Sequence, residues 1–457
     1  MENQPSSSPD STLWASILAV TIVGILHFTA GSISPEILTA ARWLTLGIMV
    51  AHGFMRRSLT TWIVVFMFIG GEIGHDFPEQ ADNLSILSKI FLNLIKCIIA
   101  PLILSMLVVG IAGHANLKQV GRMGIKALIY FEVVTTLALF IGLGAINLTK
   151  AGVGVHQIAG SEETVATPAK KSASEIILHV FPENIAKSVA NGEVLQVAVF
   201  ATIFGIGLAL VTPVKRAPLI TLLESVAEAM FKFTNIVMLF APLGVMGAMA
   251  YTVGKMGLSV LIPLLKLLFT LYGALAVFYL IVFVPIALIA KLPIRKFIQA
   301  IAEPATIAFA TASSESALPR AMENMEKFGI PRQVVAFILP TGYSFNLDGS
   351  TLYLALASVF VAQAAGIALS FGDQLLMVFT LMLTSKGVAG VPRATLVILL
   401  GTAASFNLPT WPIFLILGID QLMDMARTCT NVIGNCLATA VIAIWEGEYT
   451  PAEAQES

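Results

Sequence analysis

Long apolar runs, separated by short polar or charged stretches, dominate the pattern of this chain. Most of them approach or exceed the roughly 20 residues that an α-helix needs to cross a bilayer. The longest predict strongly tilted helices. Before residue 290 the runs are Leu13–Gly31, Leu38–Phe54, Thr61–Gly74, Leu84–Gly113, Ala127–Leu148, Ile176–Val211, Leu219–Val253 and Leu258–Ile289. The pattern predicts an all-α, multi-pass membrane protein. The first run has no basic segment before it and no clear cleavage site, which favours a membrane helix over a signal peptide.

The charges between the runs predict the orientation in the membrane. Arg56–Arg57 and the segment from Lys118 to Lys126 are basic, whereas 72–83 holds four acidic residues and no Lys or Arg. Cytoplasmic loops carry the excess of Lys and Arg. The acidic loop is therefore predicted outside, the N-terminus inside, and the polar stretch 150–175 in an external loop.

The apolar runs of the C-terminal third are interrupted in their middles by Ser, Gly, Asn, Asp or Pro. These broken runs are Phe297–Pro319, Val334–Ala365 and Leu376–Leu400. Irregular backbone at membrane depth persists only where protein or a cavity surrounds it. Paired interruptions in two inverted halves point to a transporter binding site. We predict two re-entrant hairpins, with tips at Ser313–Pro319 and Ser385–Pro392; ordinary kinked helices are the alternative.

A polar stripe crosses the last apolar run, Ile413–Trp445. Its members repeat at helical spacing and share one helical face: Asp420, Asp424, Arg427, Asn431 and Asn435. An ionisable group at bilayer depth costs about 2.5–3.5 kcal/mol on insertion scales. Such a stripe usually faces a ligand, a partner or water. The alternative is a fixed Asp424–Arg427 pair that holds two helices together.

Composition narrows the function classes. The chain has 457 residues, 57% hydrophobic and 12% charged, with a net charge of −1, so it lacks the basic footprint of nucleic-acid binding. Its three cysteines, Cys97, Cys429 and Cys436, offer no disulfide framework or CxxC metal site. No HExxH or GxSxG motif is present, so we expect neither an enzyme nor a cofactor, and no certain metal site.

Four segments carry a family resemblance: SSESALPR at 313–320, PTGYSFNLDGSTLY at 340–353, TSKGVAGVP at 384–392 and DMARTCTNVIGN at 424–435. They resemble the dicarboxylate/amino acid:cation symporter family, and bacterial proton/glutamate symporters most of all. The resemblance covers about residues 61–447 and is strongest from 305 onward. The two apolar segments in 13–57 have no place in the common pattern of the family.

The resemblance implies eight transmembrane helices, two re-entrant hairpins and inverted repeats, to which this chain adds two N-terminal helices. It also implies a homotrimer in a bacterial inner membrane, with a fixed scaffold domain and a sliding transport domain. The expected divisions are a disordered 1–12, the extra segments 13–57, helices one to six in 58–290, the hairpins with helices seven and eight in 291–447, and a tail 448–457.

The resemblance also assigns a substrate site. Arg427 matches the residue that pairs with the substrate side-chain carboxylate, and Asp424 matches the residue that holds the ammonium group. The other implied contacts are Ser314, Ser350, Thr428, Asn431 and the hairpin backbone at Gly390 and Val391. A guanidinium fork suits a carboxylate. Dicarboxylate carriers have a small residue at the position of Asp424, so this residue favours glutamate or aspartate over succinate or malate.

The implied cation sites depart from the sodium-driven pattern. One sodium site uses Asn431, backbone oxygens of Gly342 and Asn346, and an Asp that matches Asn435. Hard cations prefer a charged oxygen, so Asn435 weakens it. A second site keeps Asn346 and Asp348 and adds three side chains from the third family helix. A third uses carbonyl oxygens near Ser344, Ser385 and Val388. Leu354 replaces a Glu that couples potassium in mammalian members.

Two alignments of the third family helix remain open. Its three ligands match either Phe131, Val134 and Thr135, or, one residue along, Glu132, Thr135 and Thr136. The first alignment loses two ligands of the sodium site, and the second loses only a tyrosine.

Two carboxylates in apolar runs, Glu132 and Glu315, suggest proton coupling. Burial favours the neutral acid and lets it carry a proton; for Glu132 the alternative is a salt bridge or a snorkelling side chain, for Glu315 a solvent-facing tip. Asp348 is a further candidate for a proton or a cation. The sequence therefore predicts a proton-coupled importer of glutamate or aspartate. The alternatives are a sodium-coupled carrier, a dicarboxylate symporter, an anion-conducting pore and an intramembrane hydrolase.

Overall fold

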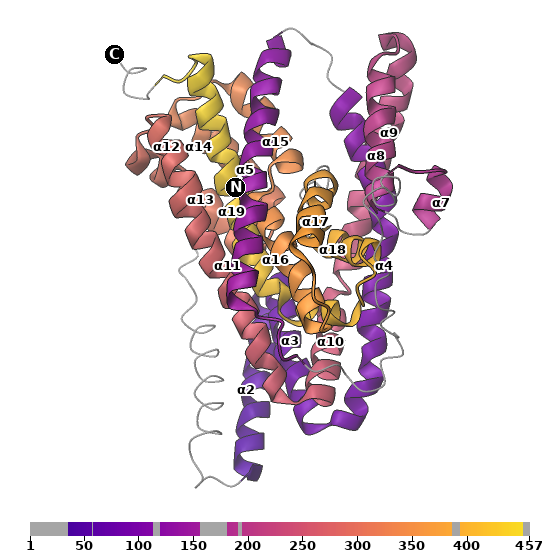
Figure 1. Ribbon diagram of the computed structural model, residues 1–457. Coiled ribbons are helices and arrows are strands. Elements are labelled where there is room, and N and C mark those ends of the chain that lie inside the picture. The colour runs from indigo at the N-terminus through magenta and orange to yellow at the C-terminus, as the bar shows by residue number, and fades with distance from the viewer. Residues whose placement is uncertain are drawn as a thin grey trace.

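The computed structural model describes residues 35–56, 58–112, 119–155, 181–190, 194–385 and 394–450 (Figure 1). All regular structure in these ranges is helical. The first helices are α2 (Pro35–Arg56), α3 (Leu59–Asp76), α4 (Pro78–Ala112), α5 (Gln119–Thr149), α7 (Ile185–Ala190), α8 (Val194–Ala209), α9 (Pro213–Met238), α10 (Ala241–Met256), α11 (Leu261–Phe278) and α12 (Val284–Ile289). The later ones are α13 (Ile294–Thr311), α14 (Ser314–Phe328), α15 (Arg332–Phe345), α16 (Asp348–Ala364), α17 (Phe371–Thr384), α18 (Ala394–Ser405) and α19 (Trp411–Glu446).

The prediction of an all-α membrane protein is confirmed. Within the described ranges, six helical segments are long and apolar enough to cross a membrane, or seven if α9 and α10, which meet at a 50° bend, form one span. The eight-helix count remains a prediction. Of the two extra N-terminal segments, the second forms α2, and Leu13–Gly31 lies outside the described residues.

The first expected hairpin corresponds to α13 and α14, which pack side by side. Ala312 ends α13 in the left-handed conformation, with φ 51°. Ser313 then adopts an extended conformation, and its side chain accepts a hydrogen bond from the backbone N–H of Ser316, which caps α14. The second hairpin corresponds to α17 and α18; its tip, 386–393, lies outside the described residues.

The helices pack in two groups. One consists of α3, α4, α8, α9 and α10, and the other of α5, α11 and α13 to α19. In Figure 1 the upper parts of α4, α8 and α9 stand apart from α5, α14 and α19. The two groups meet where α19 packs on α10 and α3, and where α18 packs on α4. This grouping is compatible with the expected scaffold and transport domains.

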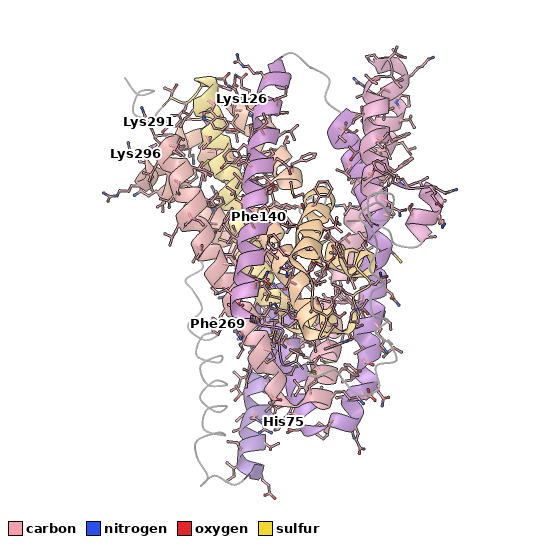
Figure 2. The ribbon with its side chains drawn as sticks, viewed as in Figure 1. His75, Lys126, Phe140, Phe269, Lys291 and Lys296 are labelled. Atoms are coloured by element: carbon pink, nitrogen blue, oxygen red, sulfur yellow. The ribbon has the colours of Figure 1, made fainter. Side chains whose placement is uncertain are left out.

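Three lysines and the acidic segment 72–83 lie at opposite ends of the molecule. Lys126, Lys291 and Lys296 lie toward one end, and His75 lies at the opposite end, beside the turn from α3 to α4 (Figure 2). That turn lies within the acidic segment 72–83. The arrangement agrees with the predicted orientation, in which the acidic turn is external.

The extra helix α2 is attached to α3 by a cluster of charged and aromatic side chains. Arg42 forms ion pairs with Glu72 and, at 2.8 Å, with Asp76. The Trp43 indole N–H donates to Asp76 Oδ2 at 2.8 Å. The side chains of Arg42, Glu72 and Asp76 are mostly buried, with exposed fractions of 14–16%. Charge-assisted hydrogen bonds in such partly buried places stabilise more than surface pairs do.

We expect Arg42→Ala to destabilise the folded protein by about 1.5–3 kcal/mol, because Glu72 and Asp76 lose a charged donor. Thermal unfolding in detergent measures the effect. The exposed ion pair between Lys187 and Glu183 offers a matched control, and Lys187→Ala should leave the melting temperature nearly unchanged. Equal melting temperatures for both variants would contradict a stabilising role for the α2–α3 contact.

Candidate functional site

The polar stripe of the last apolar run lies on one long helix, α19, and points into the protein. The exposed fractions of its side chains lie between 0 and 6%, for Asp420, Asp424, Arg427, Asn431 and Asn435. α19 packs against α13, α14, α15 and α16. Those neighbours provide the surroundings that an ionisable stripe needs at membrane depth.

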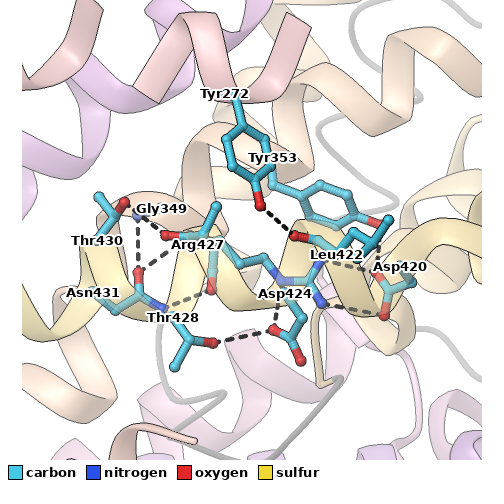
Figure 3. A network of polar contacts seen from close by, with 12 residues as sticks. Tyr272, Gly349, Tyr353, Asp420, Leu422, Asp424, Arg427, Thr428, Thr430 and Asn431 are labelled. Atoms are coloured by element: carbon cyan, nitrogen blue, oxygen red, sulfur yellow. Dashed lines mark hydrogen bonds and ion pairs between the residues drawn. The ribbon is translucent and has the colours of Figure 1, made fainter. Parts of the chain in front are cut away.

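Arg427 is held by two carboxylates of its own helix (Figure 3). Its Nε donates to Asp424 Oδ1 at 2.8 Å. Its Nη1 and Nη2 donate to the two oxygens of Asp420, at 3.0 and 3.4 Å. All three residues belong to α19. The pairing therefore does not join two helices, and the alternative interpretation, a pair that holds two helices together, is wrong. Instead it orients the guanidinium fork along one face of α19.

Tyr353 completes the surroundings of Arg427, and the sequence reasoning did not find this role. The guanidinium carbon lies 4.2 Å from the centroid of the Tyr353 ring, a cation–π contact. The Tyr353 hydroxyl donates to Asp420 Oδ1 at 3.4 Å. Tyr353 lies on α16, at the end of the motif 340–353, so its place in that motif was the available signal. Asp420 was recognised in the stripe but had no assigned role.

A break between α15 and α16 brings backbone N–H groups to the same face of α19. Asn346 and Leu347 leave helical geometry, and α16 restarts at Asp348. The amides of Gly349 and Ser350 both donate to Asn431 Oδ1, at 2.9 and 3.2 Å. Asn431 Nδ2 in turn donates to the Ser350 hydroxyl at 2.9 Å. The interrupted run therefore forms a broken helix whose new N-terminus faces α19.

The remaining substrate candidates border this network. Thr428 donates to Asp424 Oδ1 at 3.2 Å. Ser314 is buried in the first turn of α14, which packs on α19. Gly390 and Val391 lie outside the described residues. The structure thus brings together an arginine fork, a carboxylate, hydroxyl groups and an amide, which are the groups that recognise a small zwitterion with an added carboxylate.

A second polar cluster lies one turn further along α19. Asn346 Nδ2 donates to Asp348 Oδ2 at 3.0 Å and to Asn435 Oδ1 at 3.2 Å. All three side chains are buried. Gly342 on α15 packs so closely that a Cβ there would overlap Asn435 Oδ1. These hard oxygens are the kind that bind a small cation.

The third set of expected cation ligands is only partly described. Ser385 is buried at the end of α17, and its hydroxyl has no hydrogen-bond partner within the described ranges. Ser344 belongs to α15. Val388 lies outside the described residues.

Comparison with known proteins identifies the family. Residues 59–445 match the sodium:dicarboxylate symporter family. The chain belongs to this family. It is 44% identical to a proton/glutamate-aspartate symporter of Escherichia coli (strain K12), over 86% of this chain and 94% of that protein. It is 41% identical to a proton/sodium-glutamate symport protein of Bacillus caldotenax, over 86% and 96%. It is also 41% identical to a C4-dicarboxylate transport protein of Cupriavidus pinatubonensis, over 87% and 94%.

Family membership establishes the general activity. The protein is a multi-pass membrane symporter that couples a cation to glutamate, aspartate or a C4-dicarboxylate, and it is not an enzyme. Relatives of both substrate classes match it at similar identity. The choice of substrate and coupling ion therefore depends on individual site residues.

The structure corrects the expectation that Glu132 is buried. Its side chain is exposed on α5, next to the exposed Val133. The inward face of α5 carries Phe131, Val134 and Thr135, each no more than 2% exposed. Of the two alignments left open by the sequence, the one with these three residues faces the core. A one-residue slide turns a helix by about 100°, and the packing of α5 on α16 places Phe131, Val134 and Thr135 inward and Glu132 outward.

Glu315 is likewise exposed, on the first turn of α14. Among the described residues, the carboxylates with 0% exposure are instead Asp348 and Asp420. Asp420 pairs with Arg427, whereas Asp348 belongs to the cluster with Asn346 and Asn435.

Proposed function

We propose that this symporter imports glutamate or aspartate together with protons. The observation that supports this proposal most directly is the pair of Asp424 and Arg427 on one face of α19, with the guanidinium fully buried. Arg427 supplies a fork for the substrate side-chain carboxylate, and Asp424 supplies a negative charge for the ammonium group. Arg427 and Thr428 both donate to Oδ1 of Asp424, at 2.8 and 3.2 Å, so this carboxylate is held in a fixed position beside the guanidinium.

In the proposed binding step, the substrate carboxylate competes with Asp420 for Arg427. Asp420 engages Nη1 and Nη2, the two nitrogens that a bidentate carboxylate would use. Tyr353 and Asp420 hold the guanidinium plane in place. Asn431 and Ser350 then provide amide and hydroxyl groups for the α-carboxylate.

The proposed mechanism is alternating access of the elevator type. The group formed by α5, α11 and α13 to α19 would move with the substrate, and the group around α3, α4 and α10 would stay fixed, as part of a homotrimer. The packing of the helices in two groups supports this division. A dedicated anion pore is disfavoured because the buried guanidinium of Arg427 is paired with Asp420 and Asp424, which leaves a mixed-charge site instead of a positively charged path.

Sodium coupling is the second candidate. Asn346, Asp348 and Asn435 bring three side chains with hard oxygens together, and the Bacillus caldotenax relative is named for both protons and sodium. Against it, Asn435 lacks the charge of the Asp that the resemblance implies. α5 presents Phe131 and Val134 to the core, and one of the two alignments expects ligands at these positions.

Asp424→Ser tests the substrate assignment. We expect glutamate binding to weaken by roughly tenfold or more, because a charge-assisted contact to the ammonium group, about 1.5–3 kcal/mol, is lost. Succinate, which has no ammonium group, should compete better than it does in the unchanged protein. Competition against labelled glutamate in proteoliposomes measures both. Unchanged affinity for both ligands would show that Asp424 does not hold the ammonium group.

A further inference from the structure

A π-helical turn separates α11 from α12 and lies against α19. The turn is Tyr279–Phe283, and within it Val282 and Phe283 are buried. Single π-turns inside α-helices shift the register of the side chains and occur often at functional sites. The sequence motifs do not include this segment, so they assign no role to the π-turn.

The turn is fixed to α19 by a hydroxyl pair. Tyr279 Oη and Thr430 Oγ1 are 2.9 Å apart. Because the Thr430 hydroxyl also donates to the carbonyl oxygen of Ala426 at 2.9 Å, the Tyr279 hydroxyl is the donor of the pair. The Phe283 ring packs edge-on against Tyr279, with centroids 5.3 Å apart, and against Phe278 at 4.7 Å.

Phe283 and the Asp348 carboxylate both lie close to Gly434. A Cβ on Gly434 would lie 2.9 Å from the tip of the Phe283 ring, and it would overlap Asp348 Oδ2. Phe283 and Asp348 therefore surround the same point on α19, next in sequence to Asn435. The same Asp348 oxygen accepts the hydrogen bond from Asn346. The ring thus lies at the apolar side of the cluster formed by Asn346, Asp348 and Asn435.

An apolar wall beside a carboxylate affects cation binding in two ways. It excludes water, which strengthens the attraction between the carboxylate and a cation. It also limits the positions open to the carboxylate. Outer groups around a cation site commonly change its affinity by 10–100-fold when they are mutated.

We propose that Phe283, oriented by the π-turn, is a positioning residue for cation coupling. It shields the Asp348 carboxylate from water. It also keeps Oδ2 of Asp348 in the space that a side chain on Gly434 would otherwise fill. The inference rests on the proposed function, since it assigns the coupling cation to this cluster. It predicts that Phe283 variants affect the cation and leave the substrate site on the other part of α19 intact.

The test uses the full-length protein in proteoliposomes with Phe283→Ala and the milder Phe283→Leu. Glutamate accumulation is measured against an imposed pH gradient without sodium and, separately, against an imposed sodium gradient. Proton leak without glutamate is followed with an internal pH dye. Phe360→Leu is the control, because Phe360 is also buried, on α16, but lies twelve residues, about 18 Å along the helix, from Asp348.

We expect Phe283→Ala to raise the half-saturating concentration of the coupling cation roughly tenfold and to increase the leak. Phe283→Leu should have a smaller effect in the same direction, and Phe360→Leu should have none. Glutamate binding at saturating cation should change by less than about twofold in all three, because a twofold change is under 0.5 kcal/mol.

Two outcomes would overturn this inference but leave the proposed function intact. If the cation dependence and leak of Phe283→Leu equal those of the unchanged protein, Phe283 has no coupling role, even if Phe283→Ala fails to fold. If cation affinity and glutamate affinity fall together by the same factor, the ring has a general structural role. An unchanged protein that accumulates glutamate under neither gradient would instead refute the proposed function, and this inference with it.

Discussion

Arg427→Ala is expected to abolish uptake of acidic amino acids. The guanidinium is fully buried and holds Asp420 and Asp424, so its removal takes away the fork for the substrate carboxylate and leaves two acidic side chains close together. The lost substrate contact is worth about 1.5–3 kcal/mol or more. Loss of one partner of a buried ion pair also destabilises the fold by about 3–5 kcal/mol.

Arg427→Lys separates these two effects. Lysine keeps the positive charge between the carboxylates but cannot present two parallel N–H groups. We expect this variant to fold with a melting temperature closer to that of the unchanged protein, and to bind glutamate at least tenfold more weakly. Uptake in proteoliposomes, with thermal unfolding alongside, measures both. Glutamate uptake at an unchanged rate by the Ala variant would refute the role of Arg427.

The helical architecture was accessible from the sequence because membrane spans leave strong signals. Long apolar runs predicted the spans, and the Ser-rich interruption near Ser313 predicted the first hairpin, which the structure forms around Ala312. Some apolar runs did not predict where a helix ends or bends. The run Ile176–Val211 contains the short helices α7 and α8, and Leu219–Val253 is bent by 50° between α9 and α10. Hydropathy averages over such breaks, whereas Pro and Gly positions decide them.

The site was predictable where residues shared one helix and less so where helices meet. The stripe on α19 followed from helical spacing alone. The cation–π contact of Tyr353 with Arg427 joins two helices, and periodicity within one helix cannot detect it. The expected burial of Glu132 was wrong for a related reason. Apolar residues surround Glu132 on both faces of that helix, so hydropathy does not distinguish the face toward α16 from the exposed one.

The position of the buried acid determines how proton coupling should be tested. The sequence drew attention to Glu132 and Glu315, but both side chains are exposed here, and Asp348 is buried. Its hydrogen bond from Asn346 comes from a neutral amide. A carboxylate in such surroundings is stabilised by a proton or a bound cation. Movement of the surrounding helices would change that environment during transport and so release the proton.

We therefore expect an inward proton gradient to drive glutamate accumulation without sodium. Asp348→Asn should abolish this accumulation, because an amide cannot exchange a proton, whereas Glu132→Gln, on the exposed face of α5, should retain it. The measurement is uptake into sodium-free vesicles, with the external pH either below or equal to the internal pH. Sodium needs several hard oxygens in a closed shell. Asn435 replaces a charged ligand that the family resemblance implies, and in one of the two alignments of α5 Phe131 and Val134 replace two more. Accumulation that requires sodium and ignores the pH step would establish the sodium alternative, with Asp348 as a ligand instead of a proton carrier.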